Sequence, residues 1–446
     1  MKPKTKRQRR DPDRTGGLAG QDRISGLPDA LLCHILSFLQ TIYAVRTCVL
    51  SRRWKNIWES VPTLDFDYGP FRKSLKLKTI ADYVLSLRNS SSIQKFRLNW
   101  NYNGIDQSCI YRWIHTAIKR NVVELDLLVY SRLHCHIFEL RESILMCKTL
   151  IILKLRSNFI ANLPASGCFP SLKFLHVTVN PYSCSDSMVE LFSSCCLYPH
   201  LHVHSDIANV HKVPAPAVKT LRICCNTRGC KYKYLINCPK LENLVLKGNA
   251  LRKYCLGQAE SLVKASVELL HHRSNSRVDS LVTGVSSVKF LCLSANCFEV
   301  GSLPAFDSLS KLKLVVHKCF PRKLLTELLS RSPHLQYLIL EHNDTSVNEK
   351  ESKYGADSEP DECPKLRWRA PELVPSCLES NLETISIEGF KGQLNTMEVA
   401  KYFLRNGEVL KKMTFSSHPL CEEKQALHKE LLMVPKVSKA CVVDFV

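Results

Sequence analysis

This 446-residue chain lacks the sequence features of several large protein classes. No run of 18 or more apolar residues occurs, so we expect no transmembrane helix. The basic N-terminus has none of the apolar stretch that a secretory signal peptide needs. The chain also contains no Cys-x-x-Cys pair, glycine-rich phosphate loop, Gly-x-Ser-x-Gly elbow or His-Glu-x-x-His motif. These absences favour a non-catalytic protein that uses no cofactor.

Cysteine, by contrast, is abundant, with 21 residues. The count is odd, and most of these thiols stand in apolar strand or turn contexts, where cysteine behaves as a small hydrophobic residue. We therefore expect a reducing compartment and no disulfides. The nearest approach to a metal cluster is Cys195, Cys196, His200, His202 and His204, because residues two apart on a strand share one face. We favour a histidine-rich surface strand over a metal site.

Positive charge is in excess, with 62 Lys and Arg against 41 Asp and Glu, a formal net charge of +21. Such a charge favours an acidic partner. Residues 1–20 are predicted to form a disordered tail whose cluster Lys4, Lys6, Arg7, Arg9 and Arg10 is typical of nuclear import or a nucleic-acid patch. We expect the nucleus as the location, with the cytoplasm as a second one.

Residues 21–68 contain a dense apolar pattern. Pro28 and Asp29 suit a first helical turn, and Thr41 and Ser51 are suitable N-caps for two further helices. The first helix has one apolar stripe, formed by Leu31, Leu32, Ile35, Leu36 and Leu39. Three helices of this size lie near the lower limit for an independent core. The unit therefore either packs on the rest of the chain or leaves part of the stripe for a partner.

The segments LPDALLCHILSFL, AVRTCVLSRRWKNIW and VPTLDFD resemble the F-box of plant F-box/leucine-rich-repeat proteins. In that family the F-box binds the Skp-type adaptor of a cullin–RING ubiquitin ligase. Gln40-Thr41-Ile42 stands where the family usually has Pro-Thr-Lys. The resemblance implies adaptor-binding roles for Leu27, Pro28, Leu31, Leu32, Ile35, Leu36, Val49, Leu50, Trp54 and Trp58.

Residues 90–342 repeat the pattern L-x-x-L-x-L. Its last core-facing positions are Leu98, Leu127, Leu155, Val177, Val203, Ile223, Leu246, Val267, Leu293, Leu314 and Leu340. Their spacing of 20 to 29 residues is the leucine-rich-repeat period, in which each repeat supplies one strand to a horseshoe-shaped solenoid. The segments between these strands are poorly patterned, so we expect an irregular outer side.

Strand residues next to these buried positions are predicted to face the inner, concave surface. The candidate target-binding residues are Arg97, Lys154, Arg156, Arg222, Lys247 and Lys313, accompanied by Asn99, His176 and Thr178, with Asp126 and Glu341 as acidic exceptions. We expect this face to be mostly basic in its first two thirds and to bind an acidic or phosphorylated protein target, a polyanionic small molecule or nucleic acid. Arginine forks suit carboxylate and phosphate, which favours the first.

The pattern breaks at residues 343–362, which are polar and acidic and are predicted to form a flexible loop. Residues 363–420 resemble the FBD module that closes the same plant family, followed by a C-terminal segment, 421–446. Trp368, Ile387 and Phe415 extend the spacing and predict one or two more strands. A helix around Met397–Leu404 is expected to end near Asn406-Gly407.

The predicted fold is therefore α/β: a small three-helix F-box, then a leucine-rich-repeat solenoid, then an FBD-type α+β cap. The resemblance implies a non-catalytic substrate-recognition subunit of an SCF-type cullin–RING ubiquitin ligase, with a Skp-type adaptor, through it a cullin, and a protein target as partners. The alternative is a nuclear scaffold or nucleic-acid-binding repeat protein. The basic tail favours it, while the lack of aromatic residues along the basic face argues against nucleic acid.

Overall fold

A computed structural model describes residues 24–446 apart from 25, 68–73, 89–91, 102–106, 131–137, 157–158, 162–163, 165–167, 180–198, 206–211, 226–232, 250–252, 258, 271–278, 295–302, 317–321, 344–367, 391–393 and 418–423. The predicted tail 1–20 and nearly all of the predicted loop 343–362 lie outside the described residues. Among the described helices, none has the length and apolar character needed to cross a membrane.

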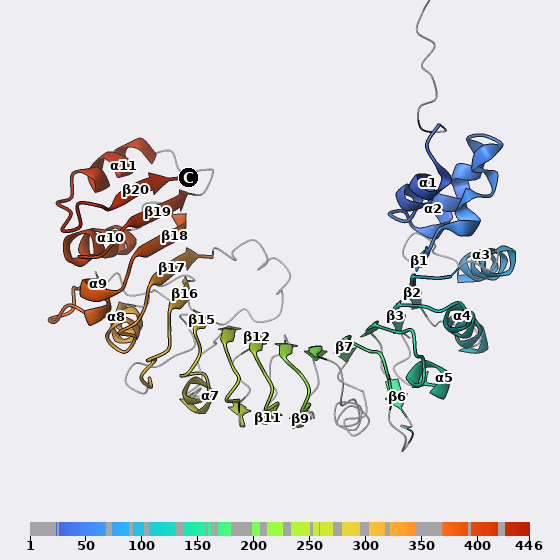
Figure 1. The fold of residues 1–446 in the computed structure, drawn as a ribbon, viewed down its shortest axis with the longest axis horizontal. Coiled ribbons are helices and arrows are strands. Elements are labelled where there is room, and N and C mark those ends of the chain that lie inside the picture. The colour runs from blue at the N-terminus through green and yellow to red at the C-terminus, as the bar shows by residue number, and fades with distance from the viewer. Residues whose placement is uncertain are drawn as a thin grey trace, which may run out of the picture.

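The chain is organised around one parallel sheet of fifteen strands, which follow one another in chain order. Figure 1 shows that this sheet is curved, with the strands along the inside of an arc and the helices outside. The strands are β1 (Thr63–Asp67), β2 (Lys95–Asn101), β3 (Glu124–Tyr130), β5 (Ile152–Arg156), β7 (Phe174–Val179), β8 (His200–Ser205), β10 (Thr220–Cys225), β12 (Asn243–Asn249), β14 (Lys264–Leu270), β15 (Phe290–Ser294), β16 (Lys311–Val316), β17 (Tyr337–His342), β18 (Thr384–Phe390), β19 (Lys412–Ser417) and β20 (Val442–Phe445).

Two rows of buried side chains, two positions apart on each strand, run across this sheet: one passes from Leu64 through Leu125 and Leu244 to Met413, and the other contains the predicted core positions. The eleven predicted core positions, from Leu98 to Leu340, are register partners of one another on successive strands. Each of them is at most 2% exposed. Ile387 and Phe415 continue this second row, as predicted, and Phe66 on β1 and Phe445 on β20 extend it at the two ends. The spacing in the sequence therefore identified one buried side chain correctly on each strand of this sheet from β2 to β19, but none on β1 or β20.

The outer side of the arc is more regular near the two ends than predicted. Its helices are α3 (Ser74–Leu87), α4 (Gln107–Lys119), α5 (Glu142–Leu145), α7 (Asp279–Gly284), α8 (Arg322–Ser330), α9 (Ser376–Ser380), α10 (Leu394–Asn406) and α11 (Lys424–Leu432). Helix α4 buries Ile110, Trp113, Ile114 and Ala117, a three-to-four-residue spacing that the sequence already contained. Toward the middle, the outer side has small sheets instead: β13 (Lys253–Leu256), β11 (Lys233–Asn237) and β9 (Lys212–Pro214), and β4 (Phe138–Leu140) with β6 (Phe159–Ala161).

The N-terminal unit has two α-helices, α1 (Asp29–Leu36) and α2 (Thr41–Arg46). The predicted third α-helix is wrong: two 3₁₀-helices, η2 (Arg53–Lys55) and η3 (Ile57–Ser60), take its place, and Ser51 caps neither of them. A further 3₁₀-helix, η1 (Thr47–Val49), directly follows α2, where the predicted second helix continued. The 3₁₀ turns bring Trp54, Ile57 and Trp58 into the core within a few residues. Thr41 is also not an N-cap, because its Oγ1 accepts a hydrogen bond from the Asp65 backbone N–H at 2.7 Å.

That bond links the N-terminal unit to the sheet, and Trp58, which packs in the main core, forms an apolar link. Arg88, at the end of α3, is buried and adds a hydrogen bond from its Nη1 to the carbonyl oxygen of Val61 at 2.6 Å. Burial, together with the nearby charge of Arg120, lowers the pKa of Arg88 to about 10. The first bond joins β1 to α2, and the second joins Arg88, which follows α3, to Val61, whose side chain lies in the small core of the N-terminal unit. The N-terminal unit therefore packs on the end of the sheet.

The C-terminal end agrees with the sequence in part. Helix α10 ends at Asn406, as predicted. Trp368 is not a strand residue: its backbone N–H donates to Asn395 Oδ1 on α10 at 2.7 Å, and its ring packs edge-on against Tyr402 at 5.1 Å. Strand β20 was not predicted, because only one short apolar pair precedes Asp444 in that segment.

We predict that Leu246→Ala lowers the free energy of unfolding by about 2–5 kcal/mol, because it leaves a cavity in the buried row. The neighbouring Val245→Ala, on the exposed face of the same strand β12, should cost less than about 1 kcal/mol. Urea unfolding of the two variants measures the difference. Equal losses would contradict the assignment of opposite faces to these two residues.

Candidate protein-interaction surfaces

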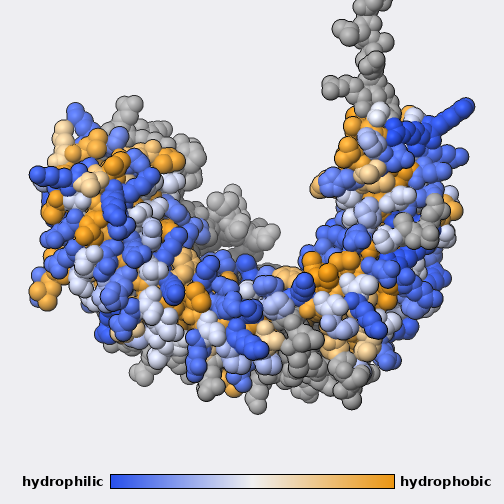
Figure 2. All heavy atoms as spheres, viewed as in Figure 1, coloured by the Kyte–Doolittle hydropathy of each residue, from blue (hydrophilic) through white to orange (hydrophobic). Residues whose placement is uncertain are grey.

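The apolar stripe of the first helix divides into two parts. Leu32 and Leu36 are fully buried in a small core with Ala44 and Trp54, whereas Leu31 is 49% exposed. The exposed apolar residues of this unit are Ile24, Leu31, Ile35, Phe38, Leu39, Tyr43, Val49 and Leu50, among which Val49 reaches 83%. Figure 2 shows hydrophobic side chains at the surface of this end of the arc, at upper right. A partner is needed to remove such a surface from water.

The predicted adaptor contact is therefore wrong for four residues, because their side chains are buried. Leu32, Leu36 and Trp54 are buried in the small core of the unit, and Trp58 is buried in the main core under the sheet, so none of the four is accessible to a partner. The stripe spans more than 100° of the helix, so a periodic pattern alone does not separate its buried edge from its exposed edge. Leu27 is half-buried, and Pro28, Leu31, Ile35, Val49 and Leu50 are exposed. Phe38 and Tyr43 were missed, although apolar residues beside the stripe were visible in the sequence.

An ion pair fixes the start of α1 beside the exposed surface. Arg53 Nη2 lies 2.7 Å from Asp29 Oδ1 and also donates to the carbonyl oxygen of Leu27. The two residues of the ion pair are 24 positions apart in the sequence. The contact holds η2 against the N-terminus of α1, where a carboxylate also favours the helix dipole.

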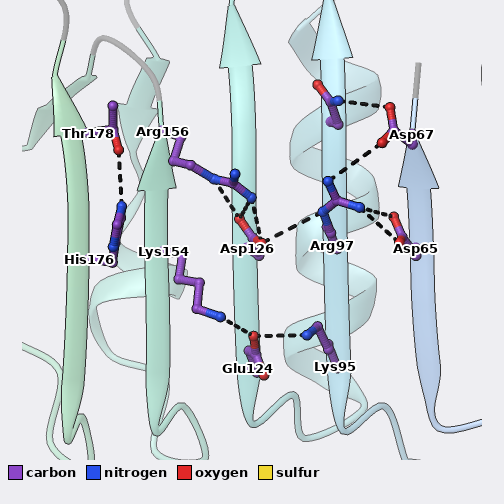
Figure 3. Close-up of polar contacts among 11 residues, drawn as sticks. Asp65, Asp67, Lys95, Arg97, Glu124, Asp126, Lys154, Arg156, His176 and Thr178 are labelled. Carbon is purple, nitrogen blue, oxygen red and sulfur yellow. Dashed lines mark hydrogen bonds and ion pairs between the residues drawn. The ribbon is translucent and has the colours of Figure 1, made fainter. Parts of the chain in front are cut away.

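The inner face of the arc begins with a ladder of charges on β1, β2, β3 and β5 (Figure 3). Arg97 Nη1 lies 3.0 Å from Asp65 Oδ2, and its Nε lies 3.8 Å from Asp126 Oδ2. Arg156 Nη2 lies 2.7 Å from both carboxylate oxygens of Asp126, which is only 5% exposed. The guanidinium of Arg97 also lies 3.5 Å from Asp67. Positive and negative side chains thus alternate across neighbouring strands.

A second group of ion pairs lies on β2, β3 and β5. Glu124 Oε1 accepts a hydrogen bond from Lys154 Nζ at 2.7 Å and lies 3.2 Å from Lys95 Nζ. Burial by itself raises the pKa of Glu124, but the bonds from Lys154 and Lys95 outweigh it and hold the pKa below its ordinary value. Glu124 is therefore ionised at neutral pH and neutralises part of the charge of both lysines.

The same pairing occurs in the second half of the arc. Lys247 Nζ lies 2.6 Å from Glu268, and Lys313 Nζ lies 2.9 Å from Glu341 and 3.2 Å from Glu388. The prediction of a mostly basic inner face is therefore wrong: five of its six cations are in ion pairs. Asp65, Asp67, Glu124, Glu268 and Glu388 were not predicted as parts of this face, because their partners stand on strands that are one or two places away in the sheet but distant in the chain. The strand register is the signal that would have found them.

Arg222 is the exception among the six predicted cations. Within the part of the chain that the structure describes, no carboxylate forms an ion pair with it. Its register partner on β8 is His202, whose own partner on β7 is His176. These three half-buried side chains lie side by side on the inner face.

The histidine-rich strand forms no metal cluster among the described residues. His200 and His202 belong to β8, whereas Cys195, Cys196 and the side chain of His204 lie outside the described residues. The described cysteines are free thiols. The predicted nuclear-targeting residues Lys4, Lys6, Arg7, Arg9 and Arg10 also lie outside the described residues.

Comparison with known proteins places these surfaces in a family. The F-box domain model matches residues 24–65, and the FBD model matches residues 370–415. The chain is similar to two proteins of Arabidopsis thaliana, F-box/FBD/LRR-repeat protein At4g00160, with 30% identity over 96% of this chain and 94% of the relative, and F-box/FBD/LRR-repeat protein At3g52680, with 32% identity over 92% and 88%. The chain belongs to the family of plant F-box/FBD/LRR-repeat proteins. The exposed apolar surface described above lies within its F-box.

We predict that Glu124→Gln lowers the free energy of unfolding at pH 7 by about 1–2 kcal/mol, because two charge-assisted contacts are lost. The pKa of Glu124 is depressed in the folded state, so its contribution is present above the unfolded pKa and is lost as the pH falls through the folded value. The difference between wild type and variant should therefore shrink below about pH 4.3.

Urea unfolding between pH 3 and pH 7 tests this, with Glu260→Gln as the control. Glu260 is exposed and makes no ion pair among the described residues, so its variant should unfold like wild type at every pH. A stability difference for Glu124→Gln that stays constant down to pH 3 would contradict the ionic origin.

Proposed function

We propose that this chain is the substrate-recognition subunit of an SCF-type cullin–RING ubiquitin ligase. Its F-box docks a Skp-type adaptor, through which a cullin is joined, and the curved sheet binds a protein target. The observation that carries the proposal is the exposed apolar surface on α1, α2 and η1 of a unit whose small core is otherwise complete. The F-box assignment of residues 24–65 supports the adaptor as the occupant of that surface.

We further propose that the curved sheet is a leucine-rich-repeat solenoid. One strand per repeat, parallel pairing in chain order and the buried row at a spacing of 20 to 29 residues support it. The arc places the F-box at one end and the FBD segment at the other, with the inner face between them (Figure 1). A target held on that face is kept at high effective concentration near the ubiquitin carrier, so the chain itself needs no catalytic residue.

The alternative of a nucleic-acid-binding scaffold receives less support. Ion pairs neutralise most of the inner-face cations, so few remain to displace counterions from a phosphate backbone. Nuclear localisation stays a prediction from the basic tail.

We predict that the double variant Leu31→Ala, Ile35→Ala weakens capture of a Skp-type adaptor by at least about tenfold, since both side chains are exposed on the proposed interface. Pull-down of the full chain with purified adaptor at moderate salt measures it. Because neither residue belongs to the core, the variant should retain the unfolding transition of wild type.

The matched control is Leu432→Ala, Met433→Ala, which removes two exposed apolar side chains at the opposite end of the arc. It should bind the adaptor like wild type. The proposal fails if wild-type chain does not capture the adaptor, or if the Leu31, Ile35 variant captures it undiminished.

A further inference from the structure

We propose that Arg222, His202 and His176 form a binding site for the phosphate group of a phosphorylated target segment. The inference rests on the proposed function, in which the inner face of the arc binds a protein target. It goes further by naming one position on that face and one chemical group.

The site is built by strand register. Arg222 on β10, His202 on β8 and His176 on β7 are successive Cα partners in the parallel sheet. Neighbouring strands lie about 4.8 Å apart, so the three side chains emerge from one line about 10 Å long. All three are half-buried and project from the face opposite the buried row. Their nitrogen donors therefore line one short stretch of the inner surface.

The charged residues on either side of these three residues are already in ion pairs, which distinguishes this part of the inner face. On one side, the ladder through Arg97, Asp126 and Arg156 satisfies its own charges. On the other, Lys247 is paired with Glu268. Arg222 lies between these groups with no carboxylate in ion-pair contact among the described residues, although its charge helps to lower the pKa of Glu268. An incoming anion therefore meets at Arg222 a guanidinium that no described carboxylate holds in an ion pair.

The histidines are held in place before any ligand arrives. The ring of His202 packs edge-on against Phe174, with 4.7 Å between centroids, and lies 6.0 Å from the ring of His176. His176 Nε2 is 3.1 Å from Thr178 Oγ1 (Figure 3). Two positioned rings cost little conformational entropy when they bind.

Burial lowers the pKa of His202, and the charges of Arg222 and His200 lower it further. On the other side of His202, its register partner on β7 is the titratable His176. His202 is therefore neutral at pH 7, which avoids repulsion with Arg222 while leaving one ring N–H as a donor.

A phosphate monoester fits this set better than a carboxylate. It has three strong acceptor oxygens and a charge near −2, which match an arginine fork and two imidazoles. Arg222 has His202 as its register partner on one side, and on the other side its partner is the half-exposed Val245 on β12. An apolar residue of the target beside the phosphorylated one can pack there.

The test uses the full chain and an array of peptides with random flanks and phosphoserine, glutamate or serine fixed at the centre. Wild type should retain phosphoserine peptides at least about tenfold better than either of the others. Arg222→Gln should abolish the selection, and Arg222→Lys should restore only part of it, because the planar fork is lost. Lys119→Gln, which removes the same charge from the outer helix α4, should bind like wild type.

Adaptor pull-down on the same preparations separates the two proposals. Retained adaptor binding with lost phosphoserine selection in Arg222→Gln supports the site. Unchanged selection in that variant overturns it, as does a wild-type chain that does not prefer phosphoserine. Binding of inositol hexakisphosphate without binding of phosphopeptides also overturns it, because the source would then be a small molecule. Adaptor binding by the F-box is measured independently of all these outcomes, because the peptide array does not involve the adaptor.

Discussion

The parallel register of the strands is the constraint on which the rest of this structure depends. Each strand from β1 to β19 presents two buried side chains, two positions apart, in line with those of its neighbours, as Leu64 and Phe66 do at one end and Met413 and Phe415 at the other. Because a slip of one residue would turn every side chain of a strand to the opposite face, these rows also fix which residues reach the inner surface. The outer helices and small sheets then cover the other side of the same core.

That register explains why the inner face is less basic than the net charge of the whole chain suggests. The chain carries a formal charge of +21, yet Arg97, Arg156 and Lys154 lie opposite carboxylates on adjacent strands. A parallel sheet places side chains about 4.8 Å apart along such a row, which is the distance at which long cations and carboxylates meet. The face is thus locally neutral over much of its length, and its recognition properties depend on the few groups that the ladder leaves available.

The F-box uses its first helix for two purposes. Its small core contains Leu32 and Leu36 of α1 together with Trp54 of η2, and leaves Leu31 and Ile35 at the surface. One helix therefore both stabilises the unit and presents an interface. The bonds from Asp65 to Thr41 and from Arg88 to Val61 fix this unit to the end of the sheet, so that its exposed apolar surface and the inner face of the sheet are held in a defined relation.

The sequence by itself determined the repeat, the buried row and the family, because a spacing of 20 to 29 residues and local apolar patterns do not depend on long-range contacts. It also predicted α10, whose apolar residues follow helical spacing. It did not separate Leu32 from Leu31, nor find the partners of Arg97 and Lys154, nor show that Trp368 leaves the sheet to pack on Tyr402. Those were decided only by the tertiary structure, since each depends on residues that stand about 20 or more positions apart in the chain and meet only when the strands stack.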